Sequence, residues 1–169
     1  MSKKRIAAGE LMRQLEADPE WVAKRAERER ELEEREIVSR SDEAMMVAEI
    51  RRVGYDIDSV WALVNNAPHP VLVRRFVGPY ERAYPILLRH LDVPHLAANR
   101  EGIIRALTVR DGGITVEASL LREFERETDP MLKWVLANAL RTAMPYHRRR
   151  KHPAIREVLK AGATKGRAI

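Results

Sequence analysis

The chain lacks cysteine, has few aromatic residues and contains no long uncharged run. Without cysteine it has neither disulfides nor thiolate metal sites. The longest stretch free of charged residues, 59–73, contains two prolines and is shorter than the ~20 residues that a membrane-spanning helix requires. Near the start, Glu10 and Arg13 interrupt any apolar segment, so no signal peptide is predicted. We therefore expect a cytoplasmic protein.

Composition indicates a helical protein with one main core. Hydrophobic residues make up 45% of the 169 residues, which is typical of a globular protein, and charged residues make up 33%. Alanine, leucine, glutamate and arginine, which favour helices, are abundant. No segment shows the sustained alternation of β-branched residues that is typical of a strand. The predicted fold class is all-α.

Positive charge is concentrated at the C-terminal end. The net charge is +6, and from Pro145 onward there are eight Lys or Arg residues and one Glu, so the rest of the chain is nearly neutral. The run at 147–152 includes Arg148, Arg149, Arg150 and Lys151. It could contact nucleic-acid phosphates, an acidic protein or anionic lipid, or it could be a solvated loop favoured by the dipole of the preceding helix.

Leu11, Met12 and Leu15 at helical spacing predict a short helix over 5–17. The capping residues Asp18-Pro19-Glu20 predict the start of a long helix that runs to Val53. Within it, 24–36 is almost wholly charged and can be helical without burying a face. Opposite charges lie four residues apart at Arg25/Glu29, Arg30/Glu34 and Glu31/Arg35. A break is conceivable at 39–42, after which an apolar face returns. We expect an N-terminal helical arm, 1–53, whose far end docks on the body.

The second half of the chain repeats itself at an offset of 33 residues. The segment 87–91 (LLRHL) corresponds to 120–124 (LLREF), and 103–107 (IIRAL) corresponds to 136–140 (LANAL). A fixed period of this length is typical of stacked helical hairpins. The predicted helices are 80–91, 96–109, 115–127 and 130–144, with a last helix, 153–161, that covers the open end.

Two hairpins are fewer than the three or so that such a stack needs. The short helix at 60–64, the end of the arm and the last helix must therefore complete the core. The predicted body is 54–161, followed by a flexible tail, 162–169. The sequence leaves the conformation of 66–79 open, with 71–77 either strand-like or a helical turn.

Paired antiparallel helices, leucine-rich in the first and Ala-Leu-rich in the second, resemble HEAT repeats of the armadillo-like superfamily over about 80–144. Thr128-Asp129-Pro130 is the part most similar to those motifs. A charged helix ahead of short helical units also resembles small bacterial HEAT-repeat proteins. The resemblance implies a short α-α superhelix that acts as a scaffold. Its second helices would present a concave face to a peptide, a protein or a nucleic acid.

With this architecture, five polar residues on the outward side of the second helices become candidates for partner contact. They are Arg100, Arg105, Lys133, Asn138 and Arg141. The same residues also fit the solvated face of an amphipathic helix.

No catalytic, metal or cofactor motif is predicted. His90 and His95 straddle a turn and share no helical face, and there is no His-Glu-x-x-His pattern, no Gly-rich phosphate loop and no nucleophile elbow. Trp134 aligns with Glu101 of the other hairpin and could face the groove, as in HEAT-like DNA glycosylases, but a core role is simpler.

The sequence therefore favours a non-catalytic protein–protein interaction module or adaptor built on HEAT-like repeats. One alternative is a nucleic-acid-associated protein that uses the basic C-terminal segment. A second alternative is a toxin-neutralising, immunity-type protein.

Overall fold

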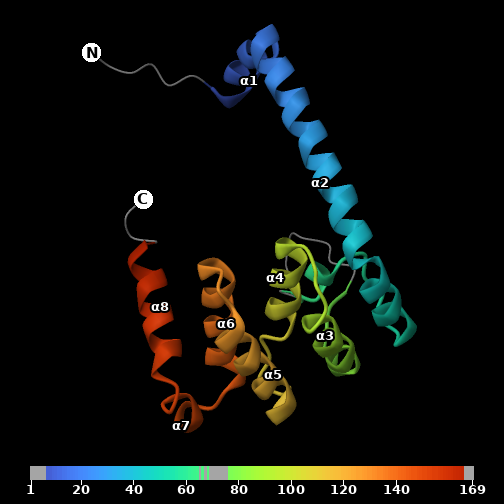
Figure 1. Ribbon diagram of the computed structural model, residues 1–169. Helices are drawn as coiled ribbons and strands as arrows, with labels where there is room; N and C mark the ends of the chain where they lie inside the picture. Colours follow the sequence, from blue (N-terminus) through green and yellow to red (C-terminus); the bar gives the residue numbers. More distant parts are fainter. Residues whose placement is uncertain (1–6, 65, 67, 69–75, 166–169) are drawn as a thin grey trace. The chain divides into compact units, whose positions relative to one another are not determined.

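A computed structural model describes residues 7–64, 66, 68 and 76–165, with side chains described as far as Gly162. Among these residues every regular element is a helix, which confirms the predicted all-α class (Figure 1). None of the described helices is both long and apolar enough to cross a membrane. Of the segment 71–77, only Phe76 and Val77 are among the described residues. Of the tail predicted at 162–169, residues 162–165 are helical instead, and 166–169 lie outside the described residues. The chain divides into two compact units, Met1–Ser39 and Arg40–Ile169.

The first unit contains α1 (Ala8–Glu16) and the beginning of α2 (Pro19–Arg52). The Asp18 carboxylate accepts a hydrogen bond from the backbone N–H of Glu20 at 2.9 Å, and Pro19 is the first helical residue, as predicted. Arg25 lies over the ring of Trp21, at 5.5 Å from its centroid. This helix start is therefore specified locally, by residues adjacent in sequence.

Exposed ion pairs line the charged part of α2. Arg25 pairs with Glu29 at 2.8 Å and Arg35 with Glu31 at 3.7 Å. The third predicted pair, Arg30/Glu34, is not formed within the described part of the chain. Each such pair stabilises a helix by about 0.2–0.5 kcal/mol, so this segment is helical without a core of its own.

The C-terminal part of α2 belongs to the second unit. The helix passes through 39–42 without the break that the sequence allowed. Beyond residue 40 one face is buried, with Met46, Val47 and Ile50 in the core. Burial of such side chains stabilises by about 1.5–3 kcal/mol each. The division between the two units therefore falls at 39/40, inside the helix, whereas the sequence placed the boundary after residue 53, where the helix ends.

Two helical hairpins form the centre of the second unit. The 3-10 turn η2 (Glu81–Ala83) leads into α3 (Tyr84–Leu91), which pairs with α4 (Ala97–Ala106). In the second hairpin α5 (Gly113–Arg126) pairs with α6 (Pro130–Ala143). The helices α4, α6 and α8 (Pro153–Lys165) stand side by side, α6 packing against both of its neighbours (Figure 1). The last helix thus covers α6 as predicted, and it extends to Lys165.

Positions related by the 33-residue repeat occupy equivalent places in the core. Leu87 and Leu120 are fully buried, and so are Ile103 and Leu136. The repeat in sequence is therefore a repeat in burial. Helix–helix packing of paired hairpins follows from it, while a HEAT-like superhelix remains a prediction.

Flanking elements complete the core, as the small number of hairpins requires. Val60 of the turn η1 (Val60–Ala62) is buried against α4, and Ile155 of α8 is buried as well. Trp134 packs across Gly162 of α8 so closely that a Cβ at position 162 would overlap the indole ring. Trp134 thus joins α6 to α8 at the edge of the core.

Candidate interaction surfaces

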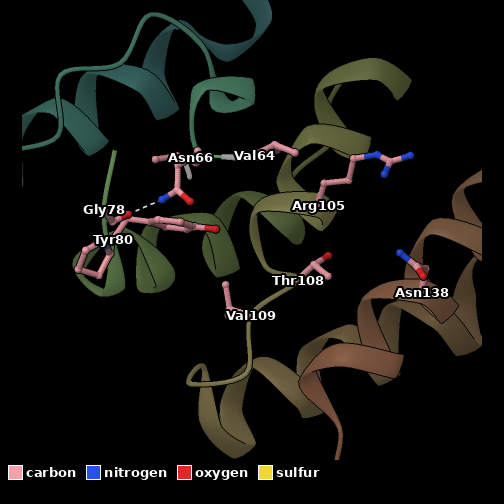
Figure 2. Close-up of a pocket in the computed structure, with 10 residues that line it drawn as sticks. Val64, Asn66, Gly78, Tyr80, Arg105, Thr108, Val109 and Asn138 are labelled. Carbon is pink, nitrogen blue, oxygen red and sulfur yellow. Dashed lines mark hydrogen bonds between the residues drawn. The ribbon is translucent and has the colours of Figure 1, made fainter. Parts of the chain in front are cut away.

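A pocket of about 480 Å³ opens between η1, the segment before η2, and the helices α4 and α6 (Figure 2). Its apolar lining includes Leu63, Val64 and Val109. The polar groups of its lining are the side chains of Asn66, Tyr80, Arg105, Thr108 and Asn138.

Internal hydrogen bonds hold the wall of this pocket in place. The Tyr80 hydroxyl donates to the carbonyl oxygen of Ala106 at 2.8 Å, and burial, with a smaller contribution from Asp111, raises the pKa of Tyr80 to about 12. The Thr108 hydroxyl donates to the carbonyl of Ile104 at 3.0 Å. The Asn66 amide donates to the carbonyl of Gly78 (Figure 2). These groups are satisfied by the fold and shape the pocket.

Two of the lining side chains, Arg105 and Asn138, have hydrogen-bonding capacity that the described residues leave largely unused. Arg105 donates from Nε to Glu101 Oε1 at 2.7 Å, and its side chain makes no other hydrogen bond among the described residues. Within the same described part, the Asn138 amide has no partner. Figure 2 shows the two side chains extending from α4 and α6 towards the same open space. They occupy equivalent positions of the repeat, so the repeat brings these two predicted contact residues together.

Two other predicted contact residues lie elsewhere. Arg100 donates to the carbonyl of Leu91 at 2.9 Å and to Glu123 Oε2 at 2.7 Å, and so ties the two hairpins together. Lys133 donates to the carbonyl of Glu127 at 2.9 Å. Neither residue lines the α4–α6 pocket. Their hydrogen bonds give both residues a role in the fold. Lys133 lines another pocket, beside Trp134 and Gly162, and contact of either residue with a partner stays a prediction.

Arg141, the fifth predicted residue on the second helices, is exposed on α6. It does not line the α4–α6 pocket. It is a surface cation on the same helix as Asn138.

The basic run folds into the short helix α7 (Tyr146–Arg149) and the turn that follows it. Arg148 lies 2.7 Å from Glu117 Oε2, a buried carboxylate, in an ion pair without the directionality of a hydrogen bond. Arg149 donates to the carbonyls of Arg141 and Met144 at the end of α6, as cationic side chains often do at helix C-termini. Two of the four predicted cations are therefore used by the fold.

The other two, Arg150 and Lys151, are exposed. Neither side chain has a partner in the part of the chain that the structure describes. Arg150 and Lys151 are therefore the cations of the run that are available to an external anion.

A chain of polar side chains joins the end of α2 to the first hairpin. His90 Nδ1 and His95 Nε2 are 3.1 Å apart, and His95 Nδ1 lies 3.0 Å from Asp42 Oδ2. At the other end His90 Nε2 lies 3.7 Å from Glu49 Oε2. Asp42 also accepts from the backbone N–H of Leu96 at 3.2 Å and thereby caps α4.

Burial, hydrogen bonds and neighbouring charges shift the pKa values of His90 and Asp42, two members of this group of polar side chains. Burial lowers the pKa of His90 below its ordinary 6.5; Glu49 opposes this shift, and His95 and Arg89 add to it. Burial acts to raise the pKa of Asp42, but hydrogen bonds from Asn99, His95 and Leu96 outweigh it and lower that pKa below 3.8. The histidine is thus held neutral and the carboxylate charged near neutral pH.

The contacts among Glu49, His90, His95 and Asp42 were not predicted from the sequence. His90 and His95 do lie on different segments, but the turn between them folds one ring against the other, with centroids 5.3 Å apart. Asp42 lies more than 50 residues from its hydrogen-bond partners Leu96 and Asn99, and no local signal announces such a contact. Among the described residues no group of three His, Cys, Asp or Glu side chains is placed to hold a metal ion.

No family model, curated protein or solved structure matches the chain. The resemblance to HEAT repeats therefore rests on the repeat residues alone and stays a prediction.

Proposed function

We propose that the chain is a non-catalytic protein-interaction module that binds a segment of a partner polypeptide in the α4–α6 pocket. The observation that carries the proposal is the convergence of Arg105 and Asn138 from consecutive hairpins on one pocket of about 480 Å³. Their neighbours in the pocket wall are already hydrogen-bonded internally. Arg105 and Asn138, which the repeat places together, therefore offer polar groups to a ligand.

The chemistry of these two groups indicates what the segment contains. An asparagine amide both donates and accepts, and so matches a peptide group. A guanidinium forms its strongest hydrogen bonds with carboxylates. The pocket volume lies within the range of sites that hold a ligand of a few side chains. We therefore expect a partner segment with an acidic side chain and one or two apolar neighbours.

Peptide selection tests the proposal. Peptides selected on the intact protein from a random displayed library should be enriched in Asp or Glu. Their affinity, measured by fluorescence polarisation, should fall about 10- to 100-fold in the double variant Arg105→Gln/Asn138→Ala, because hydrogen bonds to charged groups contribute about 1.5–3 kcal/mol. The control is Arg141→Gln, which removes an exposed charge from the same helix outside the pocket.

Equal affinities of the wild type and the double variant would contradict this assignment. A similar loss in Arg141→Gln would point to a diffuse charged face instead of the pocket. Circular dichroism of each variant checks that the fold is retained.

A specific observation also favours a second candidate function, association with nucleic acid. Arg150 and Lys151 are exposed without partners among the described residues, next to a body that is nearly neutral. Counterion release makes such binding fall steeply with salt. Retention on heparin or duplex DNA that declines with salt and is lost in Arg150→Ala/Lys151→Ala would support it. Unchanged retention in that variant would remove it.

A further inference from the structure

A second pocket, of about 270 Å³, lies between α7 and the start of α8. The apolar part of its lining, called the floor below, consists of Ile155, which is completely buried, Leu159, which is partly buried, and Pro153, which is exposed. Such a floor gains free energy when an apolar group displaces water from it.

The rim of this pocket is cationic. Arg149, Arg150 and Arg156 all line it, together with His152, and no carboxylate is among the lining residues. Arg150 and Arg156 are exposed, and neither has a partner in the described chain. The only acid on α8, Glu157, is exposed and lies outside the lining. Like charges around one small pocket repel one another, and an anion bound among them would reduce that repulsion.

Part of the rim is already fixed in position. Arg149 is held by its hydrogen bonds to the carbonyls of Arg141 and Met144, and its guanidinium lies 5.8 Å from the centroid of the Tyr146 ring. Tyr146 is 74% exposed, so most of its ring is open to a ligand. The positive end of the α8 dipole, at Pro153, adds to the attraction for an anion. The Arg149 guanidinium is therefore held in place, with the exposed Tyr146 ring next to it, at a pocket that has an apolar floor.

We propose that the α7–α8 pocket binds a carboxylate carried on a single aromatic or branched aliphatic group. The volume is slightly below that of sites for drug-sized ligands, which suits one side chain and its acid group. Two sources offer this chemistry, a free organic acid and the C-terminal residue of a polypeptide. The site shares no residue with the α4–α6 pocket, so it is tested independently of the proposed peptide binding.

The test is titration of the full chain, followed by NMR of backbone amides and by calorimetry, with three probes. They are 3-phenylpropanoate, its neutral isostere 3-phenylpropanamide, and inorganic phosphate. We expect saturable shifts confined to 146–159 for the acid, and binding at least about tenfold weaker for the amide, because the charged hydrogen bonds are lost. Phosphate, which has the charge but no apolar group, should bind more weakly than the acid.

Variants assign the binding to the rim. Arg150→Gln/Arg156→Gln should weaken binding of 3-phenylpropanoate by about tenfold or more, and Tyr146→Ser by several-fold. All three side chains are exposed, so the fold should persist, and unchanged far-UV circular dichroism checks this. Arg141→Gln is the matched control, since it removes an exposed arginine outside the pocket.

Peptides ending in phenylalanine separate the two sources. A peptide with a free terminal carboxylate that binds more tightly than 3-phenylpropanoate, while its amidated form does not, identifies a chain terminus as the ligand; equal affinities identify the free acid as sufficient. Each result supports the proposal. Equal binding of acid and amide, phosphate binding as tightly as the acid, or absence of saturation would overturn it.

Discussion

The two helical hairpins obtain their helix caps from different parts of the chain. In the second hairpin the Asp129 side chain accepts from the N–H of Leu132 at 2.8 Å and caps α6 from the adjacent residue. The equivalent position in the first hairpin is Leu96, which offers no side-chain cap. There Asp42 of α2 supplies the carboxylate. The second hairpin is therefore capped by its own sequence, whereas the first depends on a helix that precedes it.

Equivalent arginines in the two hairpins each form an ion pair with a residue that comes earlier in the chain, outside their own hairpin. Arg89 pairs with Glu49 of α2 at 2.5 Å, and Arg122 pairs with Asp92, after α3, at 2.7 Å. The residues that follow these arginines, His90 and Glu123, are also equivalent, and both contact an earlier element. His90 lies 3.7 Å from Glu49 of α2, and Glu123 accepts a hydrogen bond from Arg100 of α4. Each hairpin is thus joined to the element before it. For the first hairpin, the end of α2 takes the place of a preceding hairpin.

The largest test of this comparison is truncation. Removal of 1–39 should leave the melting temperature of the second unit nearly unchanged, because no described residue of that segment is in the core. Removal of 1–53 should lower the free energy of unfolding by about 5 kcal/mol or more, since the buried Met46, Val47 and Ile50 are lost. Calorimetry of both truncated chains measures the difference. Similar melting temperatures for the two would show that α2 is dispensable to the first hairpin.

A smaller effect is expected from the caps themselves. Asp42→Ala removes the acceptor for Leu96 N–H, the Asn99 amide and His95, and should cost about 2–3 kcal/mol. Asp129→Ala removes one capping bond and should cost about 1 kcal/mol. Urea denaturation of both variants gives the two values. A larger cost at Asp129 would reverse the proposed dependence of the first hairpin on α2.

Acid should weaken the first hairpin before the second. Because the pKa of His90 is lowered on folding, the unfolded chain binds the proton more readily, and stability present above pH 6.5 is lost as the pH falls below it. The lowered pKa of Asp42 gives a second loss below about pH 3.8.

Urea midpoints between pH 7 and pH 3 measure these two phases. His90→Gln should remove the first phase and keep the second. The exposed His147→Gln serves as the control and should keep both. If His90→Gln retained the slope just below pH 6.5, another group would be responsible.

The smallest effects concern the equivalent ion pairs. Double-mutant cycles with Arg89→Gln/Glu49→Gln and Arg122→Gln/Asp92→Asn should each give a coupling of about 0.2–1 kcal/mol, because both arginines are well exposed. Couplings of similar size would confirm that the two pairs are equivalent. A coupling in only one of them would show that the repeat extends to burial but not to surface contacts.

The helices and the hairpin pairing could be predicted from sequence because their signals are local or periodic. Asp18-Pro19 marks the start of α2, and the offset of 33 marks the core positions of both hairpins. The possible break at 39–42 was not found. Asp42 is a good capping residue, but it caps α4 instead of α2, and only the tertiary structure brings those two helices together.

The candidate pocket could be predicted in part. The repeat identified Arg105 and Asn138 as equivalent, and they share the pocket. Arg100 and Lys133 each lie five residues earlier on the same helices, which turns them by about 140° to another face. The α7–α8 pocket had no signal beyond the run of positive charge, because its floor comes from the packing of Ile155 and Leu159.

The contact of Trp134 with Gly162 gives the molecule an optical reporter at its last helix. The indole is partly buried against α8, and detachment of that helix would expose it to water. Its emission would then move to longer wavelength and become open to quenching by acrylamide. With Trp21→Phe and Trp61→Phe in place, Trp134 is the only tryptophan left in the sequence, and excitation at a wavelength that tyrosine does not absorb reports on it alone. Undocking of α8 can then be followed in time, separately from unfolding of the core.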